Sequence, residues 1–175
     1  MKKQNADLTG PVIEEARQVL VEVYPPRIAR CLKQLSEEEI WWRPNTASNS
    51  VGNLVLHLQG NVRQWIIAGL GGQPDRRDRD REFAETGPIP RRMLLAGLRK
   101  TAKEADEVLG NLSKRDLLRR FSVQGYDVTG LQVVCHVAEH FAFHAGQVIF
   151  VTKLKCAKDL KFTRLPAQRK STKVK

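Results

Sequence analysis

Residues 136–147 read His136-Val-Ala-Glu-His140-Phe-Ala-Phe-His144-Ala-Gly-Gln147 and contain three of the four histidines of the chain. On an α-helix a spacing of four residues turns each side chain only about 40° from the last, so the three imidazoles share one side. Apolar residues recur beside this stripe, which predicts a largely buried helix. They are Val133, Val134, Val137, Phe141, Ala145 and Val148.

Histidines one helical turn apart form half of a metal site, because their Cβ atoms lie roughly 6 Å apart. Catalytic metal centres commonly use three protein ligands and leave one position open, and neutral imidazole binds Zn, Ni, Fe or Cu. The remaining histidine, His57, lies in a second helical run at residues 49–65, on the flank of its apolar stripe. The spacing leaves two interpretations open: metal ligands, or core histidines satisfied by hydrogen bonds.

Apolar periodicity predicts four amphipathic helices and no convincing sheet, although residues 121–128 form a short extended excursion. Pro25 and Pro26 should kink or divide the first helix. The connections at 69–90 and 110–128 are long for an up-down arrangement. We therefore predict an all-α four-helix bundle with at least one crossover connection. The helices are expected at residues 11–35, 51–68 and 91–109, and from the capping residue Thr129 onwards.

Residues 73–82 alternate in charge without an apolar face, so we expect a surface loop whose arginines form solvated ion pairs. Asn53, Asn61 and Gln64 lie near His57 at helical spacing and can orient a ligand or meet a substrate. Gln147, one turn beyond His144, is placed to contact a bound species.

The composition indicates one domain, residues 1–162, in a chain of 175 residues that is 41% apolar. No run of about 18 apolar residues is present to span a bilayer. The polar N-terminus lacks the apolar core of a signal peptide, and the three cysteines lack the spacing of a disulfide framework. These features predict a cytoplasmic protein with reduced thiols.

The net charge of +11 is concentrated at the C-terminus, where residues 153–175 contain nine Lys or Arg and one Asp. Residues 163–175 are expected to be a basic, disordered tail that can touch phosphates nonspecifically. No nucleic-acid recognition module is visible, which favours a solvated tail over nucleic-acid binding.

The run at 49–65 and Glu139-His140-Phe-Ala-Phe-His144-Ala-Gly-Gln147 together resemble the DinB-like superfamily, which includes the YfiT-like metal-dependent hydrolases. The resemblance covers about residues 10–162. Arg79-Asp-Arg-Glu-Phe83 and Thr152-Lys-Leu154 look like a branch of that superfamily without an assigned activity.

The resemblance implies a four-helix bundle with a crossover, a divalent metal, Zn or Ni, on His57, His140 and His144, and a homodimer. It places His136 beside the ligands rather than among them. Characterised members use a low-molecular-weight thiol as transferases or isomerases. This implies a metal-bound thiolate or water as the nucleophile and leaves the catalytic residues unassigned.

Three functional hypotheses follow. The first is a metal-dependent enzyme, a thiol-dependent S-transferase or a hydrolase acting on a small molecule. The second is a non-catalytic, metal-binding dimeric bundle in which a fourth ligand such as His136 closes the site. The third is a nucleic-acid accessory protein that acts through the basic tail.

Overall fold

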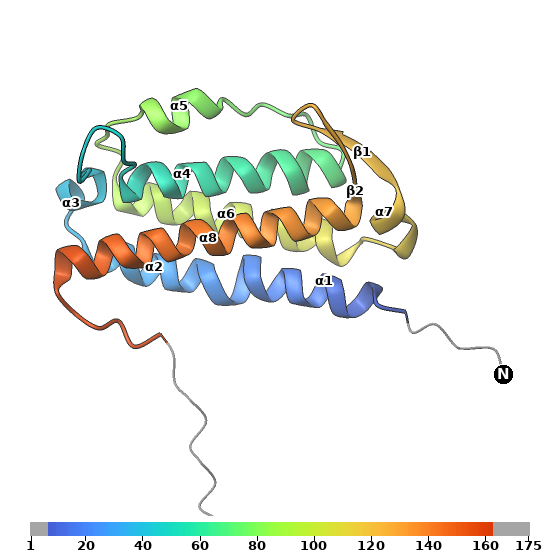
Figure 1. The fold of residues 1–175 in the computed structure, drawn as a ribbon, viewed down its shortest axis with the longest axis horizontal. Helices are drawn as coiled ribbons and strands as arrows, with labels where there is room; N and C mark the ends of the chain where they lie inside the picture. The colour runs from blue at the N-terminus through green and yellow to red at the C-terminus, as the bar shows by residue number, and fades with distance from the viewer. Residues whose placement is uncertain (1–6, 163–175) are drawn as a thin grey trace, which may run out of the picture.

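The computed structural model describes residues 7–162, and the described chain is mostly helical, which confirms the all-α prediction. Long helical segments lie side by side in Figure 1; α3 (Glu37–Trp41) lies at one end of them, α7 (Lys114–Leu118) and a hairpin lie at the other, and the short helix α5 (Arg79–Ala84) lies along one side. The first segment consists of α1 (Thr9–Arg17), the π-helical η1 (Gln18–Val23) and α2 (Tyr24–Gln34); the others are α4 (Val51–Val62) with the π-helical η2 (Arg63–Leu70), α6 (Arg91–Gly110) and α8 (Gly130–Cys156).

The long helices pack in an order that differs from their order in the chain. Helix α8 packs against α2 and α4, and α6 packs against α4 and α2. The two contacts of α8 bring distant parts of the sequence together, and α8 therefore lies between the first and second helical segments. This arrangement sets the histidines of α8 against the face of α4 that carries His57.

The core is a continuous cluster of aliphatic side chains at the helical spacing seen in the sequence. Removing this apolar surface from water is the main favourable term in folding. The cluster includes Leu20, Ile28, Leu32, Leu58, Ile66, Leu94, Leu98, Leu109, Val133, Val137 and Phe141.

Pro25 and Pro26 occupy the first turn of α2, directly after the π-helical turn η1. Neither proline has the N–H that an uninterrupted α-helix would direct at the carbonyls of Val21 and Glu22. The first helical segment is therefore divided at the prolines, where the sequence predicts a kink or a division.

Residues 120–129 form a two-stranded antiparallel sheet, so the prediction of no sheet is wrong for this segment. Strand β1 (Arg120–Val123) pairs with β2 (Tyr126–Thr129). The turn residues Gln124 and Gly125 both have positive φ, 52° and 81°, as a type I′ hairpin turn requires. The sequence did not indicate this hairpin, because Gln124 is not a residue type that favours the left-handed backbone conformation.

Three short helices complete the described chain: α3 (Glu37–Trp41), α5 (Arg79–Ala84) and α7 (Lys114–Leu118). Helix α5 lies over α4, so the prediction of a surface loop at residues 73–82 is wrong for residues 79–82 (Figure 1). Residues 73–78 do lie in a loop. Within residues 7–162 no helix is both long and apolar enough to cross a membrane. The predicted basic tail, residues 163–175, lies outside the described residues.

Helix α8 begins with a capping box, as expected from Thr129. The Thr129 hydroxyl accepts a hydrogen bond from the Gln132 N–H, and the Gln132 side chain accepts one from the Thr129 N–H. These bonds satisfy two donors that would otherwise be unpaired at the helix start.

We expect Thr129→Ala to lower the free energy of unfolding by about 1 kcal/mol, because the substitution removes the capping oxygen. Urea denaturation followed by circular dichroism measures the change. Thr129→Ser is the matched control and should stay within a few tenths of a kcal/mol of the wild type. Equal loss in both variants would show that the cap oxygen does not stabilise α8.

Candidate metal centre

Three histidines from two helices converge at one point in the molecule. His57 is buried on α4, whereas His140 and His144 are half-buried on α8. One ring nitrogen of each lies within 4.8 Å of those of the other two, and this group can hold a metal ion. The Nε2 atoms of His57 and His140 are 2.9 Å apart.

Burial keeps the histidines of α8 in the form that binds metal. Burial is the main cause that lowers the pKa of His140 to about 3, and the neighbouring imidazoles lower it further. Burial also lowers the pKa of His144, against an opposing hydrogen bond with Gln147. Metals bind neutral imidazole, so the donor chemistry of the group fits a divalent ion.

The Nδ1 side of the His57 ring contacts a buried ion pair between Glu82 and Arg77. Its Nδ1 lies 2.9 Å from Oε2 of Glu82, and the Arg77 guanidinium donates to both carboxylate oxygens of Glu82 at 2.8 and 2.9 Å. The side chains of His57, Glu82 and Arg77 are only 5%, 10% and 3% exposed, so little water reaches these bonds.

Glu82 is ionised in this setting. Burial alone would raise the pKa of its carboxyl group, but hydrogen bonds from Arg77 and His57 outweigh burial and lower it. Arg77 Nη2 also lies 3.0 Å from Nδ1 of His57, but an ionised carboxylate only accepts, so we assign the Nδ1–H of His57 as a donor to Glu82. With this tautomer the Nε2 lone pair faces His140. This is the carboxylate–histidine arrangement that orients metal ligands in other proteins.

The contacts of α5 with α4 place Glu82. The amide nitrogen of Asn53 donates to the main-chain carbonyls of Glu82 and Glu85 at 2.9 and 2.7 Å. Gly60 lies below the carboxylate, where a Cβ atom would collide with Oε1 of Glu82. Asn53, expected near a ligand or substrate, therefore holds the segment that carries the carboxylate.

The charged segment 73–82 is thus the part of the site that the sequence interpretation missed. Arg77 does not form a solvated ion pair, because its side chain is buried and also donates to Gln64 at 2.9 Å. Charge alternation without an apolar face is typical of exposed segments, and burial here arises only through contact with α4. Gly60, three residues after His57, was the available signal that something approaches that face.

The other predicted residues surround the three histidines. The His144 Nδ1–H donates to Oε1 of Gln147 at 2.7 Å, which directs Nε2 of His144 towards the group. Asn61 is buried, and its Oδ1 has no hydrogen-bond partner in the described structure. His136 lies outside the group and stacks between Trp65 and His140, with ring centroids 4.2 and 5.6 Å away.

Two cavities open beside the α8 histidines. One of about 250 Å³ is lined by His136, Glu139, His140 and Phe143. The other, of about 590 Å³, shares Phe143 and is also lined by Gln147. Its remaining lining residues are Pro44, Ala47, Ser48, Asn49, Leu54, Gly146, Phe150 and Val151.

The fold and the site define a mostly helical protein with a three-histidine group that can bind a metal ion. The sequence model of the family described as "Protein of unknown function (DUF1572)" matches residues 9–169, so the chain belongs to that family. It is a DinB/YfiT-like family, which agrees with the resemblance seen in the histidine motifs. No curated protein matches the chain.

We expect Arg77→Ala to lower the free energy of unfolding by about 3–5 kcal/mol, because it leaves the Glu82 carboxylate buried without its partner. Chemical denaturation of metal-free protein measures this. Arg76→Ala, at the exposed neighbouring position, should change stability by less than about 0.5 kcal/mol. Similar losses in both variants would contradict a stabilising role for the ion pair.

We expect Glu82→Gln to weaken metal binding about 10- to 100-fold, because a neutral amide makes His57 a poorer ligand. Competition with a chromophoric chelator measures the dissociation constant. Asp80→Asn is the matched control, since Asp80 is exposed on the same helix and should leave the affinity unchanged. An unchanged affinity in Glu82→Gln would show that the carboxylate does not tune His57.

Proposed function

We propose that this protein is a metal-dependent enzyme that uses a divalent ion, Zn or Ni, on His57, His140 and His144. The proposed reaction is thiol-dependent S-transfer or hydrolysis on a small molecule. One observation carries the proposal: three imidazole nitrogens converge within 4.8 Å, and the buried Glu82 carboxylate fixes the tautomer of one of them.

The packing order supports assignment of the fold to the crossover four-helix bundle of the DinB-like proteins. Helices α2 and α4 follow one another among the long segments, yet α8 packs against both. The chain therefore passes from the first long segment to α4 across the position that α8 fills later, and such a connection is a crossover. The long connections predict a crossover of this kind.

Three histidines and no further protein donor are typical of a catalytic metal centre. Within residues 7–162, no cysteine or carboxylate joins the group, and His136 lies outside it. This favours an open position over the closed coordination of a non-catalytic metal-binding bundle. When bound, the ion acts as a Lewis acid and lowers the pKa of a thiol or water that it coordinates.

The chain's own residues then bind and orient the reactants. Glu82 holds His57, and Gln147 holds His144 while it lines the larger cavity. Phe143 and Leu54 give that cavity an apolar wall, which suits a substrate with an apolar body and keeps water from part of its surface. A low-molecular-weight thiol is the proposed co-substrate.

A homodimer, a cytoplasmic location and residues 1–162 as a single domain stay predictions from the sequence. Nucleic-acid binding by the basic tail also stays a prediction. None of these is needed for the proposed chemistry.

We expect wild-type protein purified without chelator to contain about one equivalent of Zn or Ni, because the donor set is complete within one chain. Elemental mass spectrometry measures the content. His57→Ala and His140→Ala should lose the metal while keeping their helical circular dichroism. His136→Ala is the matched control and should retain it. A wild type that binds no metal after reconstitution would contradict the proposal.

The catalytic part requires a separate measurement. Metal-loaded wild type should accelerate the addition of bacillithiol, mycothiol or glutathione to an electrophile, or the hydrolysis of an ester or amide. His140→Ala should reduce either activity to background. Metal binding without acceleration in any of these assays would favour the non-catalytic alternative.

A further inference from the structure

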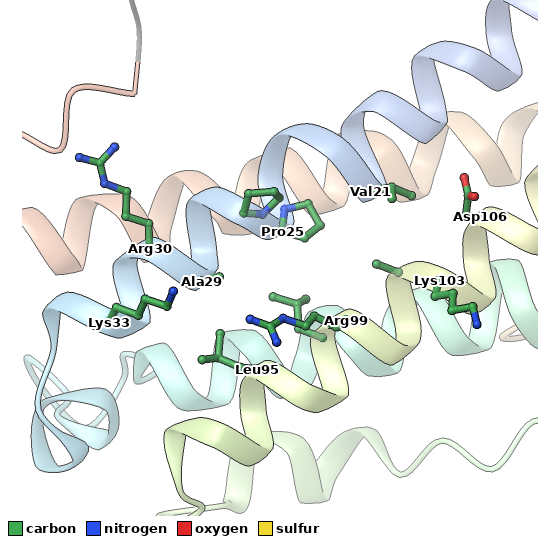
Figure 2. Close-up of a pocket in the computed structure, with 12 residues that line it drawn as sticks. Val21, Pro25, Ala29, Arg30, Lys33, Leu95, Arg99, Lys103 and Asp106 are labelled. Carbon is green, nitrogen blue, oxygen red and sulfur yellow. The ribbon is translucent and has the colours of Figure 1, made fainter.

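A third cavity lies between the first helical segment and α6, whereas the histidines lie on α4 and α8. We call it the α2–α6 groove; its volume is about 680 Å³, within the range of small-molecule sites. Figure 2 shows its residues arising from two facing helical segments. The floor is apolar and consists of Val21, Pro25, Pro26, Ala29, Leu95, Leu98 and Ala102.

Arg30, Lys33, Arg99 and Lys103 line the groove, and two of these cations lie across one end of the floor from each other. Lys33 on α2 and Arg99 on α6 point towards one another in Figure 2. Within residues 7–162, no carboxylate is within salt-bridge distance of either. Like charges that face each other repel, and an anion between them would convert this repulsion into attraction.

The opposite end of the groove carries its single acidic lining residue, Asp106, and that charge is already paired. Arg17 donates from Nε to Oδ1 of Asp106 at 2.6 Å and from Nη2 to Oδ2 at 3.2 Å. The groove therefore has an apolar floor, a cationic end at Lys33 and Arg99, and a second end where Asp106 is paired with Arg17 and Lys103 also lines the wall.

The uncovered floor also has a local structural origin. The π-helical turn η1 and the proline pair place Val21, Pro25 and Pro26 on the groove. Pro26 is exposed, and its ring presents only carbon to the cavity. Apolar surface between charged groups is the pattern of a site for a molecule with both an apolar body and a charged head.

The terminal segments of this chain do not match the charge of the groove. Residues 163–175 contain five Lys or Arg and no acidic residue, and Lys2 and Lys3 lie at the N-terminus. Positive segments would add to the repulsion between Lys33 and Arg99. Charge complementarity therefore requires an anion from outside the chain.

We propose that the α2–α6 groove binds a free single-chain carboxylate, a fatty-acid-type amphiphile. Its carboxylate lies between Lys33 and Arg99, and its hydrocarbon chain lies on the floor from Leu95 towards Val21. The Arg99 guanidinium can donate two parallel hydrogen bonds to the carboxylate, and Lys33 adds a second charge. The site is separate from the three histidines, so binding does not require a metal.

Decanoate is the probe, and isothermal titration calorimetry of the full chain with chelator present is the measurement. We expect saturable binding of one equivalent. Arg99→Ala and Lys33→Ala should each weaken it about tenfold, and Ala29→Phe, which fills the floor, should abolish it. Arg92→Ala is the matched control: this exposed arginine on α6 does not line the groove and should leave the affinity unchanged.

Control ligands distinguish a fatty-acid-type carboxylate from other occupants of the groove. Acetate should not bind measurably, because it lacks the chain, and decylamine should bind at least tenfold more weakly, because its charge has the wrong sign. Equal binding of decylamine, or unchanged decanoate binding in the Lys33→Ala/Arg99→Ala double variant, would overturn the proposal. Binding to anionic lipid vesicles without binding of free decanoate would also overturn it, because the occupant would then be a membrane surface. A wild-type dimer in light scattering that Arg99→Ala converts to a monomer would overturn it too, because the occupant would then be a second copy of the chain.

Discussion

The buried hydrogen bond between His57 and Glu82 is the constraint on which the rest of the site depends. A carboxylate that is only 10% exposed needs strong partners, and Arg77 and His57 supply them. Satisfying Glu82 in this way also determines which nitrogen of His57 remains available. The same contacts therefore stabilise the fold and orient His57.

Helix α8 contributes both to the apolar core and to the three-histidine group. Its apolar residues pack against α2 and α4, while His140 and His144 lie at the edge of that contact and reach His57. The edge position explains why these imidazoles are only half-buried and why the smaller cavity is lined by His140. A stripe at the centre of the helix contact would have been closed to any ligand.

The charged side chains of this protein are used in two different ways. Arg77 is buried and neutralised by Glu82, so it organises the interior. Lys33 and Arg99 are exposed and face each other without an acidic partner within residues 7–162, which leaves their charge available to a ligand. Net charge alone does not distinguish these roles, because both depend on what the fold places opposite each cation.

The sequence by itself determined the helices, the cap at Thr129 and the grouping of His140 with His144, because these depend on local spacing and propensity. It also identified His57 as the partner, by elimination and by resemblance. Only the tertiary structure decided that Arg77 and Glu82 lie beneath His57, that Asn53 holds their segment and that Gln124 turns a hairpin. Each of these rests on contacts between segments or on a left-handed backbone conformation that residue type does not signal.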